Sequence, residues 1–161
     1  MKFKIISNEH TPNIIENINP NIFEDKKDLL VKFLSFSRRQ HHCAGLASNQ
    51  CSVGTKKIQN RIKVPFFAMK NGLSWDLFIH PRIIEYKGEE KEVLEKCLTW
   101  IGKVLITKRY PEIDTEYYNI KGELIKKTFK GYEAQIFQHE YDHLLGIEEK
   151  FYYENENNGL Q

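Results

Sequence analysis

The feature that most constrains this chain is an HExxH motif at residues 139–143. It lies in a segment from 132 to 145 whose apolar residues recur with a helical period. On a helix, residues four apart lie on one face one turn apart, so His139 and His143 can bind one metal ion together. Glu140 can take a proton from a water on that metal without being a ligand itself. The sequence therefore predicts a helix over 132–145 that carries two ligands of a catalytic metal site.

Two histidines leave such a site incomplete, because a catalytic tetrahedral site takes three protein ligands and keeps one position open. Carboxylates that follow the motif are formal candidates for the third ligand: Glu148, Glu149, Glu154 and Glu156. Upstream of the motif, the best soft ligand is Cys97, although most lone cysteines are small buried thiols. The residues alone leave both directions open.

Composition excludes several other classes of protein. The chain has 24 basic and 22 acidic residues, and this net charge of +2 is too balanced for nucleic-acid binding by phosphate neutralisation. The 3 cysteines are an odd and sparse set, which excludes a disulfide framework. They form no CxxC pair, which excludes a four-cysteine zinc knuckle. No apolar run is long enough to cross a membrane. Because the N-terminus also lacks the apolar core of a secretory signal, we expect a cytoplasmic protein.

The length of 161 residues suits a single catalytic domain, 1–161. Apolar residues at helical spacing predict an N-terminal helix from about 25 to 40. Short β-like runs predict strands at 64–69, 75–79, 83–86, 104–107, 113–120 and 123–129. Because helices stand at the two ends and the strands run together, we expect an α+β fold with antiparallel sheets packed around the C-terminal helix. The polar residues 154–161 are expected to fray.

Three blocks of the sequence resemble the peptide deformylase family in order and spacing. Residues 45–50, GLASNQ, are similar to that family's GφxxxQ block, and residues 95–99, EKCLT, are similar to EGCLS. Residues 138–146, QHEYDHLLG, are similar to QHExDHLxG. The resemblance covers about 45–146, and three specific blocks in order are far stronger than one motif match.

The resemblance implies one divalent metal ion per chain, commonly Fe(II) in the family, with zinc or nickel able to occupy the same ligands. The implied ligands are Cys97, His139 and His143. Glu140 would be the general base and then the general acid. The side-chain amide of Gln50 and the backbone N–H of Leu98 would hold the oxyanion, as fixed donors do around a developing negative charge.

The implied reaction is hydrolysis of the N-formyl group from formyl-methionyl peptides of newly made proteins, with release of formate. The substrate would lie as an added strand between segments 44–45 and 95–96. The implied substrate-binding residues are Ala44, Gly45, Glu95, Lys96, Tyr132 and Gln135. A monomer without nucleic-acid or membrane partners is expected. Because the family's basic C-terminal helix has no counterpart before the end of the chain, any ribosome contact is expected to be transient.

Three of these positions depart from the family pattern. Lys96 replaces the glycine of EGCLS, and its ammonium could draw acidic peptides. Ala44 is smaller than the family's usual residue, and Gln135 stands where the family tends to have an apolar wall. None of these departures removes a ligand or the base, so we expect an active enzyme with altered kinetics or peptide preference.

Two rival interpretations remain at this point. A small HExxH protease would need its third ligand after His143, whereas a catalytically weak relative that only binds formyl peptides would not need Glu140. We also predict that Arg109 pairs with Glu95 and so steadies the segment of Cys97.

Overall fold

The computed structural model describes residues 1–7, 9, 12–13, 22–40, 42–55 and 58–147. The helices in these ranges are α1 (Ile22–Arg38), the short 3₁₀ helix η1 (Ser48–Gln50) and α2 (Gly131–Leu145). The strands are β1 (Lys2–Ile5), β2 (Gly45–Ala47), β3 (Cys51–Gly54), β4 (Gln59–Arg61), β5 (Phe66–Asn71), β6 (Ser74–Lys87), β7 (Lys91–Glu95), β8 (Leu105–Arg109), β9 (Glu112–Tyr118) and β10 (Leu124–Lys130).

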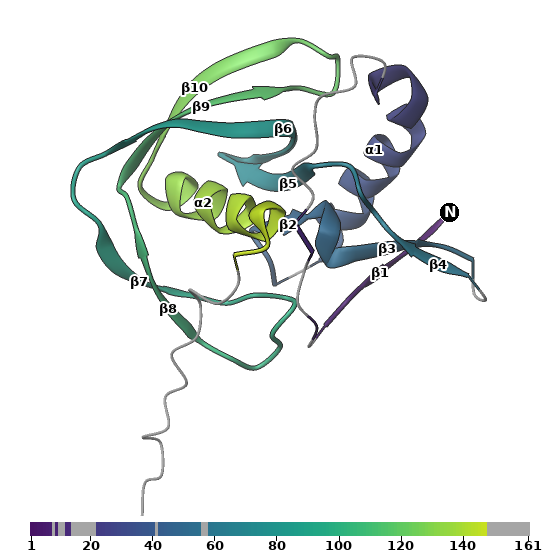
Figure 1. Ribbon diagram of the computed structural model, residues 1–161, viewed down its shortest axis with the longest axis horizontal. Coiled ribbons are helices and arrows are strands. Elements are labelled where there is room, and N and C mark those ends of the chain that lie inside the picture. The colour runs from purple at the N-terminus through teal and green to yellow at the C-terminus, as the bar shows by residue number, and fades with distance from the viewer. Residues whose placement is uncertain (8, 10–11, 14–21, 41, 56–57, 148–161) are drawn as a thin grey trace, which may run out of the picture.

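The described strands pair antiparallel in three sheets (Figure 1). The largest sheet has the order β10-β9-β6-β5-β2, a smaller one has the order β1-β3-β4, and β7 pairs with β8. Within the described part of the chain, β2 is therefore an edge strand, and β7 has a partner on one side only. These two free edges are the structural basis of the site described below.

The large sheet is covered on both faces, and its interior strand β5 is therefore buried over most of its length. Phe67 and Met69 of β5 point into a core shared with α2, whereas Phe66 and Ala68 point into a core shared with α1. This alternation is the two-residue period of a strand. The sheet thus holds α1 on one side and α2 on the other (Figure 1).

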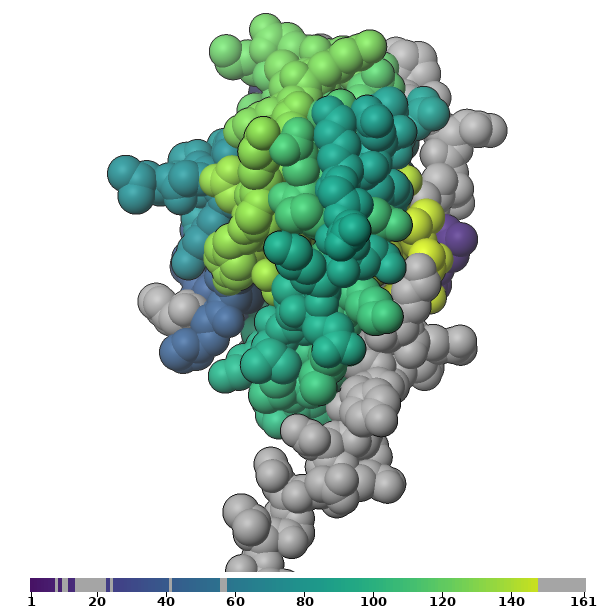
Figure 2. Space-filling model, turned by 90° about the vertical axis from the view of Figure 1, so that its left-hand side faces the viewer, coloured from purple at the N-terminus to yellow at the C-terminus, as the bar shows by residue number. Residues whose placement is uncertain are grey.

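Helix α2 is enclosed on nearly every side. It lies between the large sheet and the β7–β8 pair in Figure 1. From the left-hand side of that view, the teal strands cross in front of it, and its two ends emerge on either side (Figure 2). Gly146 ends the helix in the left-handed conformation, with φ 66° and its N–H directed to the carbonyl of His143. This enclosure makes the HExxH histidines interior residues.

The expected α+β fold with antiparallel sheets and a C-terminal helix is confirmed. The helix expected at 25–40 corresponds to α1, which begins earlier and ends at Arg38. The strands expected at 75–79 and 83–86 are one strand, β6, because a bulge at His80 bends the strand without ending it. No described helix has the length and apolarity needed to span a membrane. The tail expected at 154–161 lies outside the described residues.

Candidate metal centre and catalytic pocket

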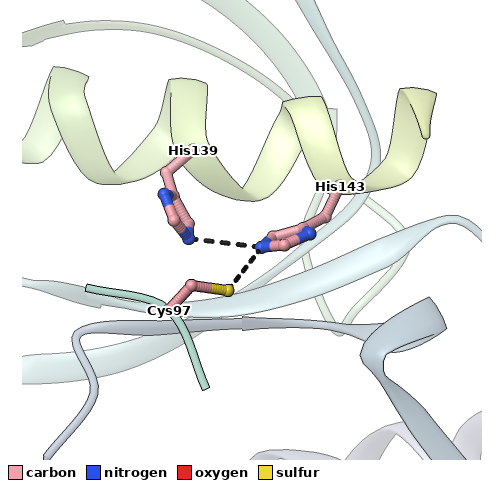
Figure 3. A group of neighbouring side chains, drawn as sticks. All are labelled: Cys97, His139 and His143. Carbon is pink, nitrogen blue, oxygen red and sulfur yellow. Dashed lines mark hydrogen bonds between the residues drawn. The ribbon is translucent and has the colours of Figure 1, made fainter. Parts of the chain in front are cut away.

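Three buried side chains bring their ligand atoms together beside α2 (Figure 3). The Nε2 atom of His143 lies 3.2 Å from Cys97 Sγ and 3.2 Å from His139 Nε2. Two atoms bound to one tetrahedral ion at about 2.0–2.3 Å would lie about 3.3–3.6 Å apart. The spacing and the donor set of one sulfur and two imidazoles therefore fit a single divalent metal. Among the described residues, the third atom of this cluster comes from Cys97, upstream of the motif. The carboxylates after residue 147 lie outside the described residues.

His139 is oriented by a buried chain of charges. Its Nδ1 atom lies 2.8 Å from Glu95 Oε2, so Nδ1 donates to the carboxylate and Nε2 faces the other ligands. Glu95 accepts two hydrogen bonds from Arg109, at 2.9 and 3.0 Å. Arg109 also donates to Asp142, one residue before His143. The predicted pair of Arg109 and Glu95 is confirmed, and it supports His139 directly.

The protonation states of Glu95 and Cys97 favour metal binding. Burial would raise the pKa of Glu95, but hydrogen bonds from His139 and Arg109 outweigh it and lower that pKa to about 2. Burial also opposes ionisation of Cys97, but the neighbouring imidazoles of His143 and His139 lower the pKa of its thiol to about 5. The sulfur is therefore available as thiolate, the form that binds metal ions.

Glu140 lies beside the cluster with one carboxylate oxygen unengaged. The residue is 3% exposed, and Oε2 has no hydrogen-bond partner among the described residues. Burial raises the pKa of this carboxyl to about 7. A Cβ atom at Gly45 would lie 2.4 Å from Glu140 Oε1, so only glycine leaves room for the carboxylate where β2 passes the helix. The structure thus explains the glycine of the first block by close approach.

The amide of Gln50 is fixed with its NH₂ group toward the metal ligands. Its Oε1 accepts from the N–H of Ala47 at 2.8 Å, and its Nε2 donates to Thr99 Oγ1 at 2.9 Å. Nε2 also lies 3.4 Å from Cys97 Sγ. Because the amide is anchored at both ends, Gln50 can present a donor to the pocket without reorganising.

Sequence reasoning missed two residues that hold this arrangement. Asn49 donates from Nδ2 to the carbonyl of His143 at 2.5 Å and so ties η1 to α2. Thr99 Oγ1 accepts a hydrogen bond from the side-chain amide of Gln50, and the backbone N–H of Thr99 donates to Cys97 Sγ at 3.4 Å. Each is a polar residue inside one of the blocks that resemble the family, next to a residue with an expected role. That position was the sequence signal from which a supporting role could have been predicted.

A pocket of about 580 Å³ opens beside the cluster, between β2, α2 and the segment after β7. Every predicted site residue except His143 lines it. His143 lies behind the others and is 1% exposed. The residues at the pocket that sequence reasoning did not name are mostly apolar: His42, Cys43, Leu94, Ile101, Gly102, Val104 and Ile136. Glu95 lines the pocket, but its carboxylate is engaged by Arg109 and His139.

A buried cysteine and two histidines around one position, with a carboxylate beside them in a pocket, define a metal-dependent hydrolase centre. The model of the polypeptide deformylase family matches residues 4–154. The chain therefore belongs to the polypeptide deformylase family, metal-dependent hydrolases that remove the N-formyl group from nascent peptides.

Individual relatives agree with this assignment. The peptide deformylase of Thermotoga petrophila is 29% identical over 125 residues, 78% of this chain and 71% of that protein. The one of Pseudothermotoga lettingae is 38% identical over 96 residues, 59% of this chain and 55% of that protein. The solved structure of the deformylase of Vibrio parahaemolyticus bacteriophage VP16T, in complex with actinonin, is 26% identical with a TM-score of 0.74. That alignment covers 89% of this chain and 98% of the phage chain.

Proposed function

We propose that this chain deformylates formyl-methionyl peptides with Glu140 as its proton carrier and with Gln50 and Leu98 as its oxyanion donors. The observation that carries the proposal is their common pocket. The Glu140 carboxylate and the anchored amide of Gln50 line the same cavity as Cys97 and His139. Cys97, His139 and His143 are the cluster of three possible ligands found among the described residues.

The resident cofactor would be one divalent ion held by Cys97, His139 and His143. When bound, it would lower the pKa of a coordinated water and polarise the formyl carbonyl. We propose Fe(II) as the native ion, with zinc or nickel able to take the same ligands. Support comes from the donor set, because thiolate and imidazole suit all three of these metals.

The chain's own residues would move one proton through the reaction. Glu140 accepts a proton from the attacking water as the new C–O bond forms at the formyl carbon. The amide of Gln50 and the N–H of Leu98 donate to the formyl oxygen while it carries negative charge. Glu140 then gives the proton to the amine nitrogen as the C–N bond breaks. The products are formate and a peptide with a free amino terminus.

The substrate would lie between the two free strand edges that flank the pocket. Ala44 and Gly45 stand at the β2 edge, and Glu95 and Lys96 stand at the end of β7. An extended peptide added there would be bound through its main chain, which suits a substrate of variable sequence. The wall for the first side chain would come from α2, where Tyr132 and Gln135 line the pocket. The side chain of Gln135 is already engaged with the carbonyl of Leu94, at 3.3 Å.

We further propose that residues 1–161 act as one monomeric catalytic domain, in the cytoplasm, on peptides as they leave the ribosome. Contact with the ribosome would be transient. These statements rest on the substrate class of the family, whose formylated peptides are made where translation occurs.

The direct test is formate release from formyl-Met-Ala-Ser by protein loaded anaerobically with Fe(II). We expect turnover by the wild type, none with acetyl-Met-Ala-Ser, and loss of turnover in Glu140→Gln with the metal retained. Glu133→Gln, on the same helix but outside the pocket, is the matched control and should remain active. Metal-loaded wild type that releases no formate would contradict the proposal, and Glu140→Gln with wild-type turnover would remove Glu140 from its role.

A further inference from the structure

Lys96 stands at the rim of the catalytic pocket between two residues that serve the metal site. Glu95 and Cys97 are 6% and 7% exposed, whereas Lys96 between them is exposed. Successive residues of an extended segment point to opposite sides. The same backbone path that turns its neighbours inward therefore leaves Lys96 at the pocket mouth, which it lines.

The ammonium of Lys96 is not neutralised by the described part of the chain. It forms no ion pair there, whereas Lys87 lies 2.7 Å from Asp114 and Lys130 lies 2.8 Å from Glu112. A lysine without a carboxylate partner keeps its full charge available to a ligand.

The surroundings of Lys96 at the mouth are mostly apolar. Exposed hydrophobic side chains line the pocket on both sides of its opening: Leu94, Ile101, Val104 and Tyr132. The carboxylates that line the pocket, Glu95 and Glu140, are buried, and Glu95 is paired with Arg109. At the rim the charge of Lys96 stands between apolar side chains, and low-dielectric walls focus the field of a charge on an incoming ligand.

Other acidic side chains on and beside β7 line a different cavity from the catalytic pocket. Glu90 and Glu92 line a second cavity of about 690 Å³, together with Lys108 of β8. In the β7–β8 register, Glu92 lies opposite Lys108. These carboxylates therefore do not neutralise the charge of Lys96 at the catalytic pocket. Lys108 lies on the paired strand outside that pocket and can serve as a control lysine.

We propose that Lys96 makes the enzyme prefer formyl-methionyl peptides with an acidic side chain at the second or third residue. The inference rests on the proposed function and names a substrate class within it. An extended peptide between β2 and the end of β7 would pass the Lys96 side chain after its first residue has entered the pocket. The pair that forms would be solvent-exposed, so the expected preference is roughly two- to five-fold in kcat/KM.

The test compares peptides that differ only in charge. Formyl-Met-Asp-Ser is paired with formyl-Met-Asn-Ser, and formyl-Met-Ala-Asp with formyl-Met-Ala-Asn. The Asp-to-Asn ratio of kcat/KM is measured for the wild type, Lys96→Gln, Lys96→Glu and the control Lys108→Gln. We expect a ratio above one for at least one pair in the wild type, about one in Lys96→Gln and below one in Lys96→Glu. Lys108→Gln should keep the wild-type ratio, and added salt should lower it.

The outcomes separate this inference from the function on which it rests. Ratios of one in the wild type for both pairs, with all peptides turned over, would refute the acidic preference alone. A preference that survives in Lys96→Gln, or that is lost equally in Lys108→Gln, would also refute the role of Lys96. Absence of turnover on every peptide by metal-loaded protein would refute the proposed function and this inference together.

Discussion

The catalytic pocket has two walls of different construction. One wall is a single regular helix, α2, which carries His139, Glu140 and His143 within five consecutive residues. The other wall is made of strand edges and the short segments beside them, at 45–50 and 95–99, which are far apart in the sequence. The helix wall is enclosed by two layers of sheet, whereas the edge wall keeps free strand edges toward the pocket.

The two walls supply different parts of the site. A helical period is enough to place two ligands and a base, because the spacing of residues on a helix is fixed. Completing the site requires the edge wall, which brings the sulfur of Cys97 and the amide of Gln50 to the same point. The edge wall also supplies the backbone with which a peptide can pair. Each wall can be altered separately, and the following changes do so, from the largest expected effect to the smallest.

Removal of the ligand from the edge wall should have the largest effect. Loss of an outer-shell partner of a metal ligand lowers metal affinity by about 10–100-fold. Cys97→Ala removes a direct ligand, so its metal affinity should fall by more than that. Cys51→Ala is the matched control, since Cys51 is buried and outside the ligand cluster. Metal content after dialysis measures both. Full metal occupancy in Cys97→Ala would show that the helix wall binds the ion without its partner.

Crowding the contact between the walls should impair the base and spare the metal. In Gly45→Ala, the new methyl group would meet Glu140 Oε1 at 2.4 Å and displace it. A misplacement near 1 Å costs about 10²-fold in rate, so kcat should fall by that order with metal content unchanged. A shorter carboxylate should relieve the clash, so adding Glu140→Asp to this variant should cost less than it costs in the wild type. If the effects of the two substitutions on kcat are strictly additive, the Glu140 carboxylate does not contact residue 45.

The link behind the walls should tune metal affinity more than chemistry. Glu95→Gln removes the charge that accepts from both His139 and Arg109. Loss of such an outer-shell partner lowers metal affinity by about 10–100-fold. Competition with a chelator measures the affinity, and kcat at saturating metal should change much less. An unchanged affinity would mean that the helix alone orients His139.

His80, outside both walls, should affect stability and its pH dependence alone. Burial lowers the pKa of this histidine below its ordinary 6.5, so the unfolded chain binds its proton first as pH falls. Its contribution to the free energy of unfolding is therefore complete above pH 6.5 and is lost as pH falls below that value. His80→Asn keeps a residue that tolerates the φ of 47°. Thermal unfolding from pH 7.5 to 5 should show a shallower dependence in this variant, and parallel curves would contradict the assignment.

The two walls also differ in how far the sequence could predict them. The helix wall was predictable from HExxH and its apolar period, and the hairpins at Gly72 and Gly122 from their turn residues. The edge wall was not, because β2 has 3 residues and the sequence of β7, KEVLE, does not alternate apolar and polar residues. Apart from Cys97, which already stood out as a candidate soft ligand, the roles of the residues at 45–50 and 95–99 were indicated only by the resemblance of these blocks. Asn49 and Thr99 were missed because their partners, the carbonyl of His143 and the amide of Gln50, come together only in the fold.

The central claim is that the two walls build one metal-dependent deformylase centre. Its most direct test is to add Fe(II) stepwise to metal-free protein without oxygen, and to follow formate release from formyl-Met-Ala-Ser at each step. The account predicts no turnover without metal, a linear rise and a break at one ion per chain, with no rise in Cys97→Ala at the same metal concentrations. Turnover without metal, or an equal rise in Cys97→Ala, would contradict it.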